Sequence, residues 1–252
     1  MHTVLFKIGP ITVYGYGFMI AIGILAAYLV TVYRAKKQKI DDEPIFSIMI
    51  CAVLFGFLGA KILYMITVLD EIIQNPKQLL DVSDGFVVYG GIISGIIAVL
   101  IYCHIKKIHF LSYMDLVLPS VALAQGFGRI GCFLAGCCYG METHSAFSVT
   151  FHDSLYAPNN IPLFPSQLVS SGLNFLNFIV LSLIARKVKK EGYVTAFYLI
   201  FYSIGRFIIE FFRGDLLRGS VGILSTSQFI SIFVLAAGIL MLIVCKNKAD
   251  KS

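Results

Sequence analysis

Seven apolar stretches, each separated from the next by a short polar segment, dominate this chain of 252 residues. They fall at 11–33, 45–69, 86–103, 113–139, 167–185, 193–212 and 226–245. Because a helix rises about 1.5 Å per residue, roughly 20 apolar residues cross the hydrocarbon core of a bilayer. With 58% hydrophobic and 13% charged residues, the sequence predicts an all-α polytopic membrane protein, with seven transmembrane helices in a single domain over residues 1–252.

The basic residues between the stretches set the expected orientation. Of the 20 Lys and Arg residues, 13 follow the first, third, fifth and seventh stretches, and only four lie on the other side. Cytoplasmic loops of membrane proteins carry such an excess of Lys and Arg. We therefore expect the N-terminus outside and the C-terminus in the cytoplasm, and the net charge of +6 reflects topology and not nucleic-acid binding.

Three cations lie inside the apolar stretches, and each follows a small residue: Lys61, Arg129 and Arg206. A cation at membrane depth is costly, and it faces a bundle interior, a cavity or a partner. The second, fourth and sixth stretches run in the same direction, so the three cations are expected at similar depth in the outer half of the bilayer. The sequence predicts a site for an anionic ligand there.

Other polar side chains are expected at the same depth. Tyr14, Tyr16 and Tyr89 lie near the start of stretches that run inward. Glu210 follows Arg206 by four residues, which is one helical turn, and is predicted to pair with it.

Arg129 has no carboxylate near it in the sequence, so it is the best candidate for contact with an external anion. Two structural alternatives stay open for the other cations. Arg206 and Glu210 could simply stabilise a helix, and Lys61 could reach the outer interface along its aliphatic stem.

Cys132, Cys137 and Cys138 follow Arg129 in a C-x₄-C-C pattern. Three interpretations stay open: small apolar side chains that fill a tight glycine-rich helix end, a disulfide on an oxidising face, or a catalytic thiolate beside a cation. No second cysteine pair or histidine cluster in the sequence has the spacing of a zinc site. The sequence therefore predicts no metal and no cofactor.

The segment 140–166 is the longest connection between apolar stretches, and it contains three prolines. Connections of this length are often functional. We expect an extracytoplasmic loop that acts as a lid or as a docking region for a substrate. Its histidines, His144 and His152, are expected to be solvated.

Glycine-rich and polar segments recur along nearly the whole chain. They lie at 9–17, 59–64, 84–91, 128–140, 164–168, 206–213 and 224–231. In order, spacing and span count they resemble the prolipoprotein diacylglyceryl transferases, bacterial membrane enzymes that begin lipoprotein maturation. Residues 128–140 are similar to the family signature G-R-x-G-N-F-x-N-x-E-x-x-G, and residues 206–213 to its R-x-x-x-E-F-F-R segment.

The resemblance implies transfer of an sn-1,2-diacylglyceryl group from phosphatidylglycerol to the lipobox cysteine of a preprolipoprotein. The product is a thioether, and glycerol phosphate leaves. The resemblance also implies a multi-pass protein of the bacterial cytoplasmic membrane, whose partners are that lipid and that signal peptide. Two alternatives are a diverged member that acts on another lipid or extracytoplasmic acceptor, and a non-catalytic protein that binds anionic lipid.

Roles within the site follow from the same resemblance. It implies Arg129 as the main phosphatidylglycerol contact, Arg206 as a second catalytic arginine and Glu210 as the group that orients Arg206. Tyr89 is the fourth implied catalytic residue, beside Arg129, Arg206 and Glu210. The implied substrate-binding residues are Arg129, Tyr16, Lys61, Gly90, Gly91, Gln167 and Arg213. Arginines held in a water-poor site stabilise the charge that develops on a phosphate leaving group.

At several polar positions of the family, this chain carries other residues. They are Lys61 for Arg, Tyr89 and Phe164 for His, Cys132 and Ala135 for Asn, and Cys137 for Glu. The cationic part is therefore kept, whereas the His of a general base is replaced. A thiol with a pKa of about 8.5 needs only about 2 kcal/mol to ionise at neutral pH, which two arginines could supply. Alternatively Tyr89, or the Cys137 and Cys138 thiols, contributes chemistry that other members lack.

Overall fold

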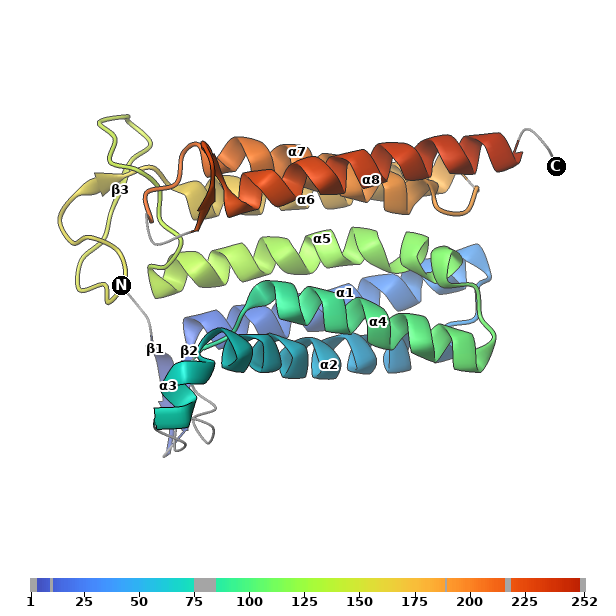
Figure 1. Ribbon diagram of the computed structural model, residues 1–252, viewed down its shortest axis with the longest axis horizontal. Coiled ribbons are helices and arrows are strands. Elements are labelled where there is room, and N and C mark those ends of the chain that lie inside the picture. The colour runs from blue at the N-terminus through green and yellow to red at the C-terminus, as the bar shows by residue number, and fades with distance from the viewer. Residues whose placement is uncertain (1–3, 10, 75–84, 189, 216–218, 250–252) are drawn as a thin grey trace. The chain divides into compact units, whose positions relative to one another are not determined.

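Seven long helices form most of the protein in a computed structural model that describes residues 4–9, 11–74, 85–188, 190–215 and 219–249 (Figure 1). They are α1 (Gly15–Gln38), α2 (Glu43–Thr67), α4 (Val88–Lys106), α5 (Phe110–Ala135), α6 (Ser166–Lys187), α7 (Tyr193–Glu210) and α8 (Thr226–Ala249). Each is long and apolar enough to cross a membrane. The prediction of a mostly helical polytopic membrane protein is confirmed for the described part of the chain.

Short elements precede or connect these helices. α3 (Leu69–Gln74) follows α2, and three two-stranded antiparallel sheets lie outside the helices. The strand pairs are β1 (Val4–Ile8) with β2 (Ile11–Tyr14), β3 (Val149–Thr150) with β4 (Pro162–Leu163), and β5 (Ser220–Val221) with β6 (Leu224–Ser225). The described core is therefore helical, and the sheets shape the connections.

Two of the differences between the observed helices and the predicted spans have a clear local cause. Residues 11–14 form β2 and not the first turn of a helix, because the alternating Ile-Thr-Val-Tyr segment pairs with β1. α5 was expected to continue further, but it ends at Ala135, since Gly136 adopts a left-handed φ of 76°. Cys137 and Cys138 therefore lie outside α5, in the turn that follows it.

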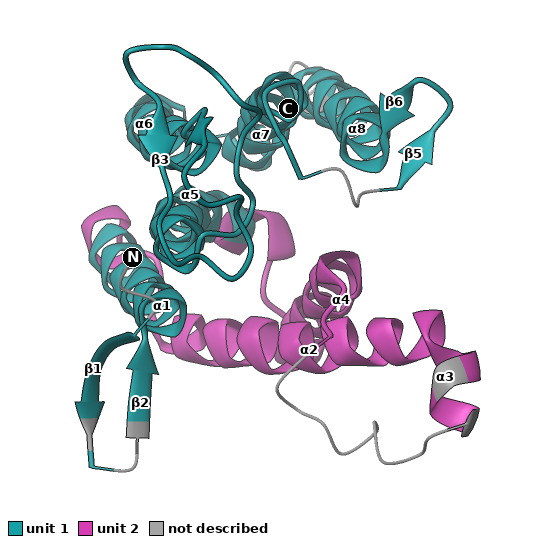
Figure 2. Ribbon diagram, turned by 90° about the vertical axis from the view of Figure 1, so that its left-hand side faces the viewer, with its two compact units in different colours: residues 1–34, 114–252 teal, residues 35–113 magenta. Residues whose placement is uncertain are grey.

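The chain divides into two compact units (Figure 2). The first unit, residues 1–34 and 114–252, contains most of α1 and of α5 together with α6 to α8. Its buried cluster includes Ala122 of α5, Leu181 of α6 and Val194 of α7. In a bilayer, such contacts hold helices together through van der Waals packing.

The second unit, residues 35–113, contains α2, α3 and α4. Glycines let α2 and α4 approach closely, because a Cβ added at Gly90 would overlap the carbonyl oxygen of Gly59. A Cβ at Gly91 would likewise meet a backbone oxygen of α2. Ser94 Oγ donates to a backbone carbonyl of α2 at 2.7 Å. Small residues at a helix contact are typical of membrane bundles.

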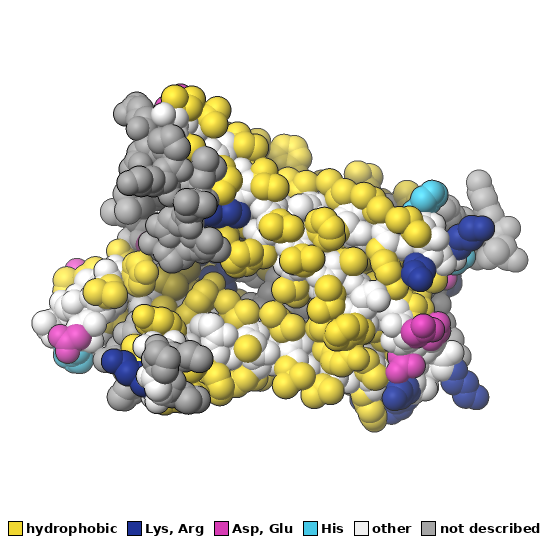
Figure 3. Space-filling model, turned by 90° about the horizontal axis from the view of Figure 1, so that it is seen from below, with side chains coloured by type: hydrophobic (Ala, Val, Ile, Leu, Met, Phe, Trp, Pro, Cys, Tyr) yellow, Lys and Arg dark blue, Asp and Glu magenta, His cyan; other side chains and the backbone are white. Residues whose placement is uncertain are grey.

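Apolar side chains cover the outside of the helices. Large aliphatic residues such as Leu25, Ile97 and Leu240 are exposed. Figure 3 shows hydrophobic side chains along the helical part of one face, with most of its Lys, Arg, Asp and Glu side chains toward the ends. Helix surfaces that contact lipid are apolar, whereas charged residues belong at the interfaces.

A half-buried carboxylate at one end of the first unit holds α7 against α5. Asp115 accepts hydrogen bonds from the backbone N–H of Gly192 at 2.6 Å and of Thr195 at 2.7 Å. The Thr195 hydroxyl also donates to it at 2.6 Å. An acceptor at a helix N-terminus satisfies donors that have no partner inside the helix. Asp115 thereby fixes the start of α7, the helix that carries Arg206 at its other end.

Candidate active site

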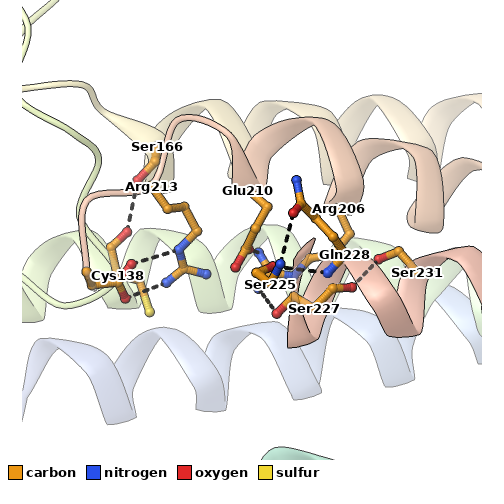
Figure 4. A network of polar contacts seen from close by, with 10 residues as sticks. Cys138, Ser166, Arg206, Glu210, Arg213, Ser225, Ser227, Gln228 and Ser231 are labelled. Atoms are coloured by element: carbon orange, nitrogen blue, oxygen red, sulfur yellow. Dashed lines mark hydrogen bonds and ion pairs between the residues drawn. The ribbon is translucent and has the colours of Figure 1, made fainter. Parts of the chain in front are cut away.

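Two partners hold Arg206, the arginine of α7 (Figure 4). Arg206 Nη1 lies 2.8 Å from Glu210 Oε2, which confirms the predicted ion pair one helical turn apart. Arg206 Nη2 donates to Ser227 Oγ of α8 at 2.8 Å. The side chains of Arg206 and Glu210 are only 13% and 5% exposed, so the guanidinium is kept in one orientation.

The start of α8 fixes Ser227 in turn. Ser225 and Gln228 form a reciprocal cap, in which the backbone N–H of each donates to the side-chain oxygen of the other at 3.1 Å. Ser231 Oγ donates to the carbonyl oxygen of Ser227 at 2.7 Å. Ser227 was not among the predicted site residues, although the Ser-x-x-Gln capping pattern beside it is present in the sequence.

A cavity of about 340 Å³ is lined by residues of α5, α6 and α7. Arg129 and Arg206 both line it, so the structure brings two of the three predicted cations to one cavity. Its wall is mainly apolar, with Leu173 and Ile208 among the lining residues, and Tyr202 contributes a phenol. Such a site suits a ligand with an apolar body and one charged group.

Arg129 forms no ion pair with a carboxylate among the residues that the structure describes. Its electrostatic neighbours are the thiols of Cys132, Cys137 and Cys138 and the phenol of Tyr202. A guanidinium removed from water is costly without an anionic partner. Arg129 is therefore the candidate for contact with an external anion.

Tyr16, near the start of α1, lies beside this arginine. A Cβ added at Gly131 would come within 3.2 Å of the Tyr16 ring, so the ring packs closely on α5. Tyr16 interacts electrostatically with Arg129 and with the three thiols. Tyr14, which is expected at the same depth from the sequence, is the last residue of β2 and is exposed.

The turn after α5 brings three cysteine side chains together. The sulfur atoms of Cys132, Cys137 and Cys138 all lie within 4.8 Å of one another. The backbone N–H of Cys137 donates to the carbonyl oxygen of Cys132 at 3.1 Å. Gly136 and Cys138 have left-handed φ values of 76° and 59°. That conformation is unfavourable for a residue with a side chain, so other contacts must maintain it at Cys138.

The first residues of α6 maintain that turn. Ser166 Oγ donates to the carbonyl oxygen of Cys138, and Gln167 Nε2 donates to that of Cys137, both at 2.9 Å. Ser166 and Gln167 are 2% and 1% exposed. Gln167, predicted to bind substrate, thus contacts the cysteine turn, while its Oε1 is buried without a hydrogen-bond partner in the described part of the chain.

Two thiols of this turn have pKa values shifted in opposite directions. Hydrogen bonds from the Cys132 and Cys137 thiols hold the pKa of Cys138 below its usual range. The guanidinium groups of Arg213 and Arg129 lower that pKa further. The pKa of Cys137 is raised, since its hydrogen bonds with the other two thiols favour the protonated form. The three thiols therefore influence one another, and the two arginines favour the ionised form of Cys138.

Arg213 fixes the segment that follows α7. Its Nε and Nη2 donate to the two carboxylate oxygens of Asp215 at 3.0 and 2.8 Å. Burial raises the pKa of Asp215 more than Arg213 lowers it. Gly140 pairs with Arg213 in an antiparallel bridge. Phe164 stacks on Phe212 with ring centroids 5.0 Å apart, so Phe164 packs where the family motif has a polar His.

Four of the predicted site residues belong to the second unit. Lys61 Nζ lies 5.2 Å from the ring centroid of Tyr64 and 5.4 Å from that of Phe86, which are cation–π distances. Tyr89 is half-buried in the first turn of α4, and the two glycines that follow it make the close contact with α2. The structure therefore gives Lys61 aromatic neighbours within its own unit.

The loop of residues 140–166 has a small core of its own, and β3 and β4 pair within it. The buried residues of this core are Phe151, Ala157 and Leu163. Phe147 and Leu155, by contrast, are 82% and 85% exposed. The loop is thus an ordered structure that presents apolar side chains on its surface.

Comparison with known proteins identifies the family. The family model described as prolipoprotein diacylglyceryl transferase matches residues 3–244. A Clostridium tetani protein named phosphatidylglycerol--prolipoprotein diacylglyceryl transferase is 50% identical over 95% of this chain and 96% of its own length. A Clostridium perfringens protein, named as transferase 2 of this kind, is 46% identical over 100% of this chain and 98% of its own length. These matches confirm the resemblance seen in the sequence: the chain belongs to the prolipoprotein diacylglyceryl transferase family.

Proposed function

We propose that this protein transfers the sn-1,2-diacylglyceryl group of phosphatidylglycerol to the lipobox cysteine of a preprolipoprotein. The names of its relatives describe a transferase of this kind. The observation that carries the proposal for this chain is the cavity that Arg129 and Arg206 line together, with its mainly apolar wall. A phospholipid has the matching chemistry, because an anionic phosphate is attached to two hydrocarbon chains.

The two arginines bind the phosphate and stabilise the leaving group. When the carbon–oxygen bond between the diacylglyceryl group and the phosphate breaks, negative charge grows on the departing glycerol phosphate. Donors held in place at such a charge each contribute about 10²–10³-fold to the rate. Arg206 is already oriented by Glu210 and Ser227, so it needs little reorganisation. Arg129 supplies the main phosphate contact, and the Tyr16 phenol adds a donor.

The distribution of basic residues supports an orientation with the N-terminus outside and the C-terminus in the cytoplasm. In that orientation, the turn after α5 and the loop 140–166 face the outer side of the bacterial cytoplasmic membrane. An exported preprolipoprotein presents its lipobox on that side. The two units act as one membrane domain in this proposal.

The loop 140–166 serves as the docking region for the acceptor peptide. Its exposed Phe147 and Leu155 match the apolar character of a signal peptide. Exposed apolar side chains of this kind mark interaction surfaces when they are grouped. Phe147→Ser together with Leu155→Ser should raise the KM for the peptide and leave the KM for the lipid unchanged.

The remaining predicted substrate contacts are testable one at a time. Lys61→Ala and Tyr89→Phe each change one side chain of the second unit, whereas Gly90→Ala and Gly91→Ala change the contact between α2 and α4. If Lys61 and Tyr89 contact substrate, their variants lower transfer while the folded protein keeps its thermal stability. A variant with normal transfer removes that residue from the site.

Rescue of cells depleted of their own transferase tests the function. The chain should restore the mass increase of a lipoprotein by one diacylglyceryl group, and Arg129→Ala should not. Arg186→Ala is the matched control, because Arg186 is exposed in the last turn of α6. Absence of rescue by wild-type protein that is present in the membrane would contradict the proposal. Lipid cleavage without peptide modification would point to another acceptor.

A further inference from the structure

We propose that Cys132, Cys137 and Cys138 form a zinc site with three thiolate ligands and one open position, which takes the acceptor cysteine. The inference rests on the proposed function, because the acceptor of that reaction is a thiol. Zinc is bound by thiolates in tetrahedral geometry, and catalytic zinc sites use three protein ligands with water or substrate in the fourth position. The sequence alone predicted no metal, since a structural site needs a fourth protein ligand at a suitable spacing.

The three sulfur atoms have nearly the separation that zinc requires. Two sulfur atoms on one tetrahedral zinc ion lie about 3.8 Å apart, given a zinc–sulfur bond of about 2.3 Å. The sulfur atoms of Cys132, Cys137 and Cys138 lie within 4.8 Å of one another. Small side-chain rotations close this difference, because two of the three residues lie in a turn and only Cys132 is on α5.

The backbone conformation of the turn and its hydrogen bonds keep the three cysteine side chains close together. Cys138 keeps a left-handed φ of 59°, which a residue with a side chain rarely adopts. Ser166 and Gln167 hold the carbonyl oxygens of Cys138 and Cys137 through half-buried hydrogen bonds. Cysteines that only filled space at a helix end would not require this backbone conformation or these contacts. Held ligands with fixed outer contacts are the usual construction of a metal site.

The surrounding charges fit a zinc–thiolate group. One Zn²⁺ ion with three thiolates carries a single net negative charge. Arg129 interacts electrostatically with all three thiols, and Arg213 interacts with Cys138. Because Arg213 is also paired with Asp215, Arg129 is the cation that balances the zinc group. Charge removed from water is tolerated when it is paired in this way.

Arg129 also joins this site to the lipid cavity, which it lines. The lining residues in the described part of the chain include no histidine and no carboxylate. Within this described lining, no imidazole or carboxylate is present to accept the proton of the acceptor thiol. A thiol that coordinates a metal ion is deprotonated outright, so zinc can generate the nucleophile beside the phosphate.

The step balances without an oxidant or a reductant. The acceptor thiol loses its proton to water, and its sulfur replaces water at the open position. The sulfur attacks the sn-3 carbon of the lipid, so a carbon–sulfur bond forms while the carbon–oxygen bond to the phosphate breaks. Glycerol phosphate leaves with the electron pair. The thioether product is neutral and binds zinc weakly, so it dissociates and water returns.

Metal analysis of the full chain, purified in detergent with reduced thiols and loaded with zinc, tests the site. We expect one zinc ion per chain. Cys132→Ser, Cys137→Ser and Cys138→Ser should each lower zinc affinity by more than about 100-fold, since loss of an outer contact alone costs about 10–100-fold. Cys51→Ser, a cysteine of α2 in the second unit, is the control and should keep the zinc. A wild-type protein that does not retain zinc overturns the proposal.

Cobalt substitution tests the open position. Co²⁺ bound to three thiolates gives a sulfur-to-metal charge-transfer band, and a lipobox peptide should strengthen it by adding a fourth sulfur. A peptide with Ser in place of the acceptor cysteine should leave the band unchanged. A band that does not respond to the cysteine peptide overturns the role assigned to the open position.

Transfer assays with and without a chelator separate this inference from the proposed function. Transfer that is lost with zinc and regained on its return supports both. Full transfer by zinc-free protein overturns the zinc site and leaves the function standing. Zinc that binds the peptide thiol without any lipid transfer supports the site and contradicts the function. A disulfide among the three cysteines of the active enzyme, seen as a loss of two hydrogens in mass, overturns the zinc site.

Discussion

The arginine cluster and the cysteine cluster both belong to the first unit, and they are built in opposite ways. Arg206, Glu210 and Ser227 lie on the regular helices α7 and α8, where an i,i+4 pair and a capped helix start fix them. Cys137 and Cys138 lie in a left-handed turn. Two hydrogen bonds hold this turn in place, and they come from residues that lie 30 and 28 positions further along the chain.

The difference separates two tasks of the proposed reaction. Stabilising a phosphate leaving group needs fixed positive charge, which helix geometry supplies directly. Activation of a thiol nucleophile needs a group that removes its proton, and the identity of this group can differ between proteins. A turn held by tertiary contacts can carry different side chains for this purpose. The predictions below test whether the two clusters act separately, as this contrast implies.

Loss of Arg129 should have the largest effect. Arg129→Ala should lower transfer by about 10³-fold, because one fixed donor at a developing anion is worth about 10²–10³-fold and Arg129 also balances the thiolates. Transfer to a lipobox peptide in phosphatidylglycerol vesicles measures it, with Arg186→Ala as the control. An Arg129→Ala enzyme within tenfold of the wild type would remove this arginine from the mechanism.

Removing the charge of Glu210 should have the next largest effect. Glu210→Gln keeps the shape of the side chain but no longer fixes Arg206 by charge, and a misplacement of about 1 Å can cost about 10²-fold in rate. We expect kcat to fall while the KM for the lipid changes little, and zinc content should stay at the wild-type value. Equal losses of zinc and kcat would show that the two clusters are not separate.

At neutral pH, the rate of transfer should be about 30-fold higher for the wild-type enzyme with zinc than for enzyme without it. A zinc-bound acceptor thiol is already a thiolate, so wild-type transfer should change little as the pH rises above neutral. In zinc-free protein, or in Cys137→Ser, only the thiolate fraction reacts, so the rate should rise about tenfold per pH unit up to a thiol pKa of about 8.5. Parallel pH profiles for the two enzymes would contradict a zinc-bound nucleophile.

A pair of glutamine variants should give the smallest and most selective effects. Gln167→Ala removes a hydrogen bond to the cysteine turn and should lower zinc affinity by about 10–100-fold, with a smaller loss of transfer when zinc is saturating. Gln228→Ala loosens the start of α8 and should leave zinc affinity unchanged while kcat falls severalfold. Metal titration measures the zinc affinity of both variants, and transfer kinetics measure their kcat.

Much of the arginine cluster could be predicted from the sequence because its determinants are local. Hydropathy and length predicted the seven spans, and a spacing of four residues predicted the Arg206–Glu210 pair, which the structure confirms. The Ser225-x-x-Gln228 cap was also present as a local pattern, although its link to Arg206 through Ser227 depends on how α7 and α8 pack.

The cysteine cluster could not be predicted in the same way. Hydropathy continued the fourth span to residue 139, whereas Gly136 ends α5 and turns the chain back, so that three sulfurs converge. That outcome depends on hydrogen bonds from Ser166 and Gln167, which no periodicity in the sequence reveals. The start of the first span was wrong for a related reason, because pairing with β1 turned residues 11–14 into a strand.

The stoichiometry of the reaction with purified protein tests the central claim most directly. Wild-type protein, headgroup-labelled phosphatidylglycerol and a lipobox peptide should give one thioether per glycerol phosphate released, and Arg129→Ala should give neither product at a comparable rate. Release of glycerol phosphate without thioether, or formation of thioether at the wild-type rate by Arg129→Ala, would contradict the assignment of this cavity to diacylglyceryl transfer.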